Sequence, residues 1–201
     1  MKQANLRLAK PEDAEKILKV LAPYIRDTAI NFEYEVPDTE EYAKHIESIS
    51  RKYPYIVCEI EGEIVGFAYA SAHRSKSAYM WNAELSVYVD KDYLRLGIGH
   101  SLYSALIDIL KLQNFENVYG VVTIPNENSE WLHRSMGFEL VAVYRKTGFK
   151  LGRWHDVAWY VKYIGNHITP PRPVIPIVDL NESEVSEILN KNRKMVWLSG
   201  R

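Results

Sequence analysis

Cysteine is nearly absent from this sequence, since Cys58 is the single one among 201 residues. No intramolecular disulfide can form. Because Cys58 lies in the apolar run 55–60, we expect a buried, inert thiol rather than a nucleophile or a metal ligand. His73, His100 and His155 do not have the spacing of a metal site. We therefore predict that the protein holds no metal.

Long apolar runs and an excess of charge of one sign are also missing. No stretch approaches the ~20 apolar residues that a membrane-spanning helix needs, and residues 1–5 lead into an alternating strand without an apolar signal core. A net charge of -1 argues against a broad basic surface for nucleic acid. We expect a cytoplasmic protein that has no nucleic-acid partner and no membrane partner.

What the sequence does have is enough apolar content for one substantial core, at 47% of residues. Hydrophobic periodicity alternates between strand-like and helix-like segments. Strands are predicted at 5–8, 55–60, 64–72, 80–90, 118–124, 139–145 and 157–163, and helices from Pro11, at 39–51, at 97–112 and at 126–136. This pattern indicates an α/β fold with a mixed, mostly antiparallel sheet flanked by helices.

The character of the chain changes after Gly165. The proline-rich run 169–176 cannot extend a sheet and is typical of polyproline II, and a helix start follows at 181–184. We therefore predict one domain over residues 1–165 and a C-terminal extension over 166–201, appended to it as a tail with a short helix.

The segment Leu94–Leu102 joins an apolar strand to an amphipathic helix through two closely spaced glycines. Glycine lets the backbone turn tightly and approach a ligand, and the first turn of a helix offers unpaired N–H groups to an anion. A lone Gly-x-Gly is weak evidence of a phosphate site, but flanking segments strengthen this one.

Glu84 is an unusual residue for the middle of an apolar strand. With a period of two it shares a face with Asn82, Ser86 and Tyr88. Two interpretations are open: a solvated glutamate on an outer face, or a general base whose pKa is raised by partial burial.

The downstream segment 126–138 reads as a short helix that ends at a glycine. Asn126 and His133 lie about two helical turns apart, so both could face the same ligand. His133 is either a structural histidine packed beside Trp131 and Met136 or a group that supplies a proton near neutral pH.

In this order, these segments resemble the GNAT superfamily of acetyl-CoA-dependent N-acetyltransferases, and most closely its phosphinothricin N-acetyltransferase family. The resemblance covers about 6–163, and its most specific pieces are 31–33, 78–89 and 147–157. One departure is Leu94, which stands where the superfamily usually has Gln or Arg.

The resemblance implies acetyl-CoA as co-substrate and assigns residues to it. The catalytic positions match Glu84, as general base, and His133, where most of the superfamily has a tyrosine. The residues implied in binding acetyl-CoA are the strand edge Val87, Tyr88 and Val89, the pyrophosphate loop Arg95, Leu96, Gly97, Ile98, Gly99 and His100, and Asn126. Backbone N–H groups carry most contacts in such loops, so binding is expected despite Leu94.

The acceptor site is implied less directly. An amino-acid acceptor needs a cation for its carboxylate, and an apolar wall would complete the site. The candidates in the matching regions are Phe32, Arg74, Lys76, Tyr88 and Lys150. For the three cations, solvated surface charge is an equally good interpretation.

The resemblance implies direct acetylation of the α-amino group of a small substrate such as phosphinothricin, methionine sulfoximine or methionine sulfone, by a homodimer. One alternative acceptor is a protein N-terminus, a lysine or a polyamine. Another alternative is a protein that binds acetyl-CoA without catalysis.

Overall fold

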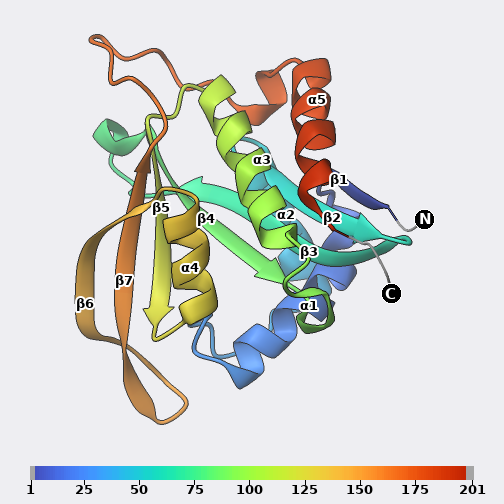
Figure 1. Ribbon diagram of the computed structural model, residues 1–201, viewed down its shortest axis with the longest axis vertical. Coiled ribbons are helices and arrows are strands. Elements are labelled where there is room, and N and C mark those ends of the chain that lie inside the picture. Colours follow the sequence, from blue (N-terminus) through green and yellow to red (C-terminus); the bar gives the residue numbers. More distant parts are fainter. Residues whose placement is uncertain (1–2, 198–201) are drawn as a thin grey trace.

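One sheet of seven strands organises the molecule. In the computed structural model, which describes residues 3–197, the strand order is β1-β2-β3-β4-β5-β7-β6 (Figure 1). The strands are β1 (Ala4–Leu8), β2 (Tyr55–Ile60), β3 (Glu63–Ala72), β4 (Asn82–Val89), β5 (Asn117–Ile124), β6 (Glu139–Lys150) and β7 (Arg153–Tyr163). Among these described strands, β4 and β5 make the one parallel pair. The expected mostly antiparallel α/β fold is confirmed.

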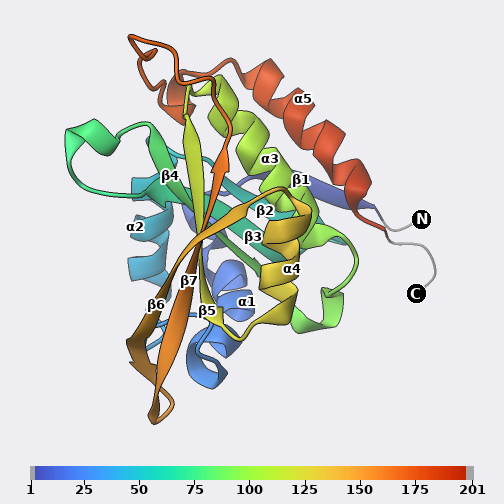
Figure 2. The same cartoon turned by 60° about the vertical axis from the view of Figure 1, so that its left-hand side comes forward.

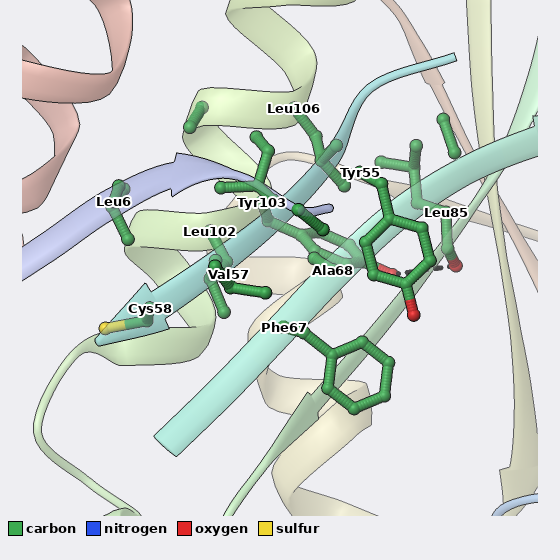
Figure 3. Packing of buried hydrophobic residues seen from close by; sticks show 14 of the residues in the cluster. Leu6, Tyr55, Val57, Cys58, Phe67, Ala68, Leu85, Leu102, Tyr103 and Leu106 are labelled. Carbon is green, nitrogen blue, oxygen red and sulfur yellow. Dashed lines mark hydrogen bonds between the residues drawn. The ribbon is translucent and has the colours of Figure 1, made fainter. Parts of the chain in front are cut away.

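Helices cover both faces of the sheet. On one face lie α1 (Ala14–Asp27) and α2 (Thr39–Ser50); on the other lie α3 (Ile98–Leu112), α4 (Glu127–Ser135) and α5 (Glu182–Asn192) (Figures 1 and 2). Figure 3 shows Leu102, Tyr103 and Leu106 of α3 packed in the core. Within residues 3–197, no helix has the length and apolar character to cross a membrane.

Three boundaries differ from the sequence-based expectation. Pro11–Asp13 forms a 3₁₀ turn, and α1 begins only at Ala14. The central strand begins at Asn82, because Ser77–Tyr79 forms a separate 3₁₀ turn. The last two strands are longer than predicted, since Leu151 and Gly152, both with positive φ, make a two-residue turn that lets the hairpin continue to its tip.

The C-terminal extension is not a mere appendage. Its proline-rich part is followed by α5, which packs against α3 and β1 (Figure 2). Ile177, Val185 and Leu189 are buried in the same hydrophobic cluster as the rest of the core. Residues 171–176 form neither helix nor strand. The docking of α5 depends on contacts with α3 and β1, which lie far from it in the sequence.

Candidate active site

The strands β4 and β5 separate at the centre of the sheet. Their parallel register ends at Leu85 and Gly120, whereas the register of β4 with β3 continues to Val89 (Figure 1). The edge of β4 that carries Val87, Tyr88 and Val89 therefore turns away from β5, as Figure 1 shows. A strand edge of this kind can pair with an extended ligand through its backbone N–H and C=O groups.

The glycine loop lies at the end of β4. Arg95 and Gly97 both have positive φ, 63° and 79°, and α3 begins at the next residue, Ile98. Left-handed residues beside a helix start direct successive N–H groups to one side, which makes a concavity for an anion. Leu94 is 44% exposed and offers no polar side-chain group. The loop is therefore suited to bind phosphate through its backbone and the Arg95 side chain.

Asn126 caps α4, the helix next to this loop. Its Oδ1 accepts a hydrogen bond from the backbone N–H of Ser129 at 3.2 Å, and its own N–H donates to Glu130 at 3.1 Å. A capped helix start is a normal use of asparagine. The predicted contact of Asn126 with acetyl-CoA stays a prediction.

Glu84 lies on the α1/α2 face of β4, between the buried Ala83 and Leu85. Its Oε1 is 3.0 Å from Nδ1 of His73, which follows β3. Burial raises the pKa of the Glu84 carboxyl above its ordinary value, while the neighbouring charges of His73 and Arg74 oppose the shift. A carboxylate with a raised pKa, held by a histidine, has the properties of a general base.

His73 was not predicted to belong to the site. Its ring stacks on Tyr119 of β5 at 4.0 Å between centroids, and Trp159 of β7 meets its edge at 5.8 Å. The Arg74 guanidinium lies 5.6 Å from the Trp159 ring centroid. The signal that could have found His73 is the register that pairs Ser71 with Glu84, because a residue two positions beyond Ser71 is a diagonal neighbour of Glu84.

His133 lies on the opposite face of the sheet and is 2% exposed. Its Nδ1 is 2.8 Å from the carbonyl oxygen of Ser129, and its Nε2 is 3.2 Å from the hydroxyl of Tyr103. Since a carbonyl only accepts, Nδ1 carries the proton. Burial lowers the pKa of His133, which favours the neutral ring. Both ring nitrogens have partners, so the geometry supports the structural interpretation, and the catalytic role stays a prediction.

Tyr103 links this histidine to the point where the strands separate. Its hydroxyl is 3.2 Å from the carbonyl oxygen of Leu85, the last residue of β4 paired with β5 (Figure 3). A Cβ on Gly120 would collide with the His133 ring, so only glycine fits there. The contacts of His133 thus hold α3 and α4 against β4 and β5 at this point.

The segment between α1 and α2 contacts both β4 and the β6–β7 hairpin. Asn31 donates to the Tyr88 hydroxyl at 3.1 Å, and Phe32 packs directly on Gly148 of the β6–β7 hairpin. The Lys150 ammonium donates to the carbonyl oxygens of Ile25 and Asn31, both at 2.6 Å.

For Lys150 the structure corrects one interpretation. The side chain is 4% exposed, so it is not solvated surface charge. Its two carbonyl partners show that it ties the segment after α1 to the hairpin. Arg74 and Lys76 are both exposed. The roles of all three cations in binding an acceptor remain predictions.

A cavity of about 790 Å³ opens between α2 and the segment that joins α1 to α2. Its floor includes Tyr69, whose register partner Ser86 is on the same face of β4 as Glu84. Its lining contains four carboxylates: Glu33, Glu35, Asp38 and Glu41. All four acids fall between residues 33 and 41, but only the fold shows that they line a cavity together with Tyr69 of β3.

Two other features bear on the chemistry. Cys58 is fully buried, and burial raises the pKa of its thiol to about 12, so it is inert as predicted. Among residues 3–197, no three histidine, cysteine, aspartate or glutamate side chains are grouped so that they could hold a metal ion.

Known proteins share both the sequence and the fold of this chain. A family model described as an acetyltransferase (GNAT) domain matches residues 6–159. The phosphinothricin N-acetyltransferase of Streptomyces viridochromogenes is 33% identical over 176 residues, which cover 88% of this chain and 96% of that protein. The L-methionine sulfoximine/L-methionine sulfone acetyltransferase of Salmonella typhimurium is 28% identical, over 83% of this chain and 98% of that protein.

A solved structure gives the same result. The crystal structure of a GNAT superfamily phosphinothricin acetyltransferase from Sinorhizobium meliloti, in complex with AcCoA, aligns with a TM-score of 0.79 at 31% identity. The alignment covers 90% of this chain and 96% of that one. The similarity therefore extends over nearly the full length of each relative.

Proposed function

Since this chain belongs to the GNAT acetyltransferase family and uses acetyl-CoA as co-substrate, we propose that it acetylates the α-amino group of a small amino-acid-like acceptor. Phosphinothricin, methionine sulfoximine and methionine sulfone are the proposed class, as the names of the relatives suggest. The observation that carries the proposal is the contact between Glu84 of β4 and His73, which follows β3, just before β4 and β5 separate.

Each residue of the site has a separate proposed role in this reaction. Bound acetyl-CoA supplies an activated acetyl group, for which the β4 edge and the glycine loop are the proposed binding surfaces. Glu84 accepts a proton from the acceptor ammonium, because only the neutral amine is a nucleophile. His73 orients the carboxylate through its Nδ1 contact at 3.0 Å. The aromatic rings of Tyr119 and Trp159 hold His73 in place.

Thiol release from acetyl-CoA tests this proposal directly. The acceptor panel contains phosphinothricin, methionine sulfoximine, methionine sulfone, ordinary amino acids, spermidine and a lysine peptide. Selective turnover of the first three supports the proposal. Turnover confined to spermidine or the peptide contradicts it, and so does full activity of a Glu84→Gln variant.

The acid-lined cavity favours a second candidate, an acceptor that carries an additional positive charge, such as a lysine or a polyamine. Carboxylates bind ammonium groups, and Glu33, Glu35, Asp38 and Glu41 line the same cavity. A double variant, Glu33→Gln with Asp38→Asn, separates the candidates. It should raise the KM for spermidine if the cavity binds a cation, and leave the KM for phosphinothricin unchanged or lower.

We also propose that two copies associate through the β6–β7 hairpin. Large apolar side chains are exposed there, which is unusual for a surface that stays in water. They are Leu140, Val141, Tyr144, Phe149, Leu151 and Trp154. Light scattering should give the mass of a dimer for the unmodified chain and a lower mass for Leu140→Lys with Val141→Lys; a monomeric unmodified chain contradicts the proposal.

A further inference from the structure

Residues 195–197 of the C-terminal extension pack directly on the glycine loop. The backbone N–H of Trp197 donates to the carbonyl oxygen of Leu96 at 2.9 Å. The carbonyl oxygen of Met195 lies so close to Gly97 that a Cβ there would collide with it. Gly97 is therefore required both for its positive φ and for this contact.

A second set of contacts fixes the end of α5, from which this segment continues, to α3. The Ser101 hydroxyl, in the first turns of α3, donates to the carbonyl oxygen of Asn192 at 2.9 Å. Further along α3, Asp108 accepts from Lys191 at 3.1 Å and from the Asn192 carboxamide at 3.3 Å. The segment 193–197 is thus held between α5 and the loop rather than resting loosely on it.

The extension contacts the loop from the side away from the separated strands. A Cβ on Gly99 would meet Leu132 of α4 at 3.7 Å and Val89 of β4 at 3.9 Å, so Gly99 faces those elements. Gly97 faces Met195 instead. Figures 1 and 2 both show α4 and α5 on opposite sides of α3. The segment can support the loop without covering the surface proposed to bind acetyl-CoA.

Such support matters because the loop conformation is costly. Arg95 has a φ of 63°, which a residue with a side chain rarely adopts. A loop that must be ordered by its ligand binds more weakly than one that is ordered beforehand, since the entropy of ordering opposes binding. We propose that residues 193–197 position the glycine loop for the pyrophosphate of CoA, so that the extension sets the affinity for this co-substrate; the inference rests on the proposed role of the loop.

Two chains that differ only in this segment test the inference. One ends at Asn192 and lacks it; the control ends at Trp197 and keeps it. Calorimetric titration with CoA should give a Kd about tenfold higher for the shorter chain. The KM for acetyl-CoA should rise by a similar factor, while kcat and the KM for the acceptor stay unchanged. Equal Kd values for CoA, with or without a lower melting temperature, overturn the inference, because the segment then only stabilises the fold.

Point variants of the full chain give the same test if the shorter chain fails to fold. Trp197→Pro removes the backbone N–H that donates to the carbonyl oxygen of Leu96. Trp197→Ala keeps this N–H and removes only the indole. Weaker CoA binding in the proline variant alone supports positioning through the backbone. Equal weakening in both variants overturns it, since the indole would then contact CoA itself. Because CoA binding needs no acceptor, a failure of the proposed acceptor class leaves this result intact.

Discussion

Two histidines lie against consecutive residues of β5, on opposite faces of the sheet. His73 stacks on Tyr119 and contacts Glu84; His133 packs on Gly120 and contacts Tyr103. The side chain of His73 is 10% exposed and its partner carboxylate 29%, while His133 is 2% exposed with both nitrogens bonded. The same residue type thus serves two purposes. One histidine contacts a partly exposed carboxylate, which we propose is the general base, and the other holds four elements together.

The comparison predicts its largest effect at Glu84. Glu84→Gln keeps the size of the side chain and removes the base, so kcat should fall by about 10²–10⁴-fold. Glu139→Gln, an exposed change at the start of β6, is the control and should be silent. Steady-state rates near neutral pH measure both. If kcat of Glu84→Gln falls by less than a few-fold, Glu84 is not the general base.

Gly120→Ala tests the structural role of the other side. The new methyl group would collide with the His133 ring, and overpacking of a filled core costs about 1–3 kcal/mol in the free energy of unfolding. Gly99→Ala is the matched control for stability, because its methyl group makes only ordinary contacts. Urea unfolding measures both variants. Unchanged stability of Gly120→Ala would show that His133 is not a fixed part of the core.

His73→Phe should reduce kcat/KM by about tenfold, since a hydrogen bond to a charged group is lost while stacking on Tyr119 is kept. The contact with His73 lowers the pKa of Glu84. Without it the pKa rises, and because the deprotonated form is active, the acidic limb of the kcat/KM profile should move to higher pH.

A double-mutant cycle gives the control for His73. If His73 acts through Glu84, His73→Phe should change nothing further in the Glu84→Gln background. An acidic limb that stays in place, or an additive loss in the double variant, would contradict the positioning role.

The smallest effect concerns the pH dependence of stability. Burial lowers the pKa of His133 in the folded state, so the unfolded state takes up the proton first. The contribution of the neutral ring is complete above the unfolded pKa of about 6.5 and is lost as pH falls below it, by at most about 1.4 kcal/mol per pH unit. Urea unfolding at pH 7.5 and 5.5 should show a shallower loss in His133→Gln than in the unmodified chain; equal slopes contradict the assignment.

Local patterns were enough to predict most of the fold. The strand over 55–60, the alternation around Glu84 and the short helix that ends before Gly137 follow from side-chain periodicity and from the tendency of glycine to end helices, which depend on near neighbours in the chain. The length of the β6–β7 hairpin was underestimated. Its turn places Leu151 at a positive φ, which leucine rarely adopts, so the sequence does not predict a turn there.

The candidate site was predictable only in part. Glu84 and the glycine loop stand out in sequence because their residue types are unusual where they occur. His73 and the buried amine of Lys150 do not, because each depends on a partner from another element. The acids at 33–41 are neighbours in sequence, but the cavity that they line with Tyr69 exists only in the folded chain.

The sequence by itself determined the α/β class, the inert cysteine, the glycine loop and the polar residue in the central strand. All of these rest on the local properties of a few adjacent residues. Only the tertiary structure decided which histidine meets Glu84, and that the extension contacts the glycine loop. Such contacts depend on strand register and helix docking, which many distant residues fix together through burial of a common core.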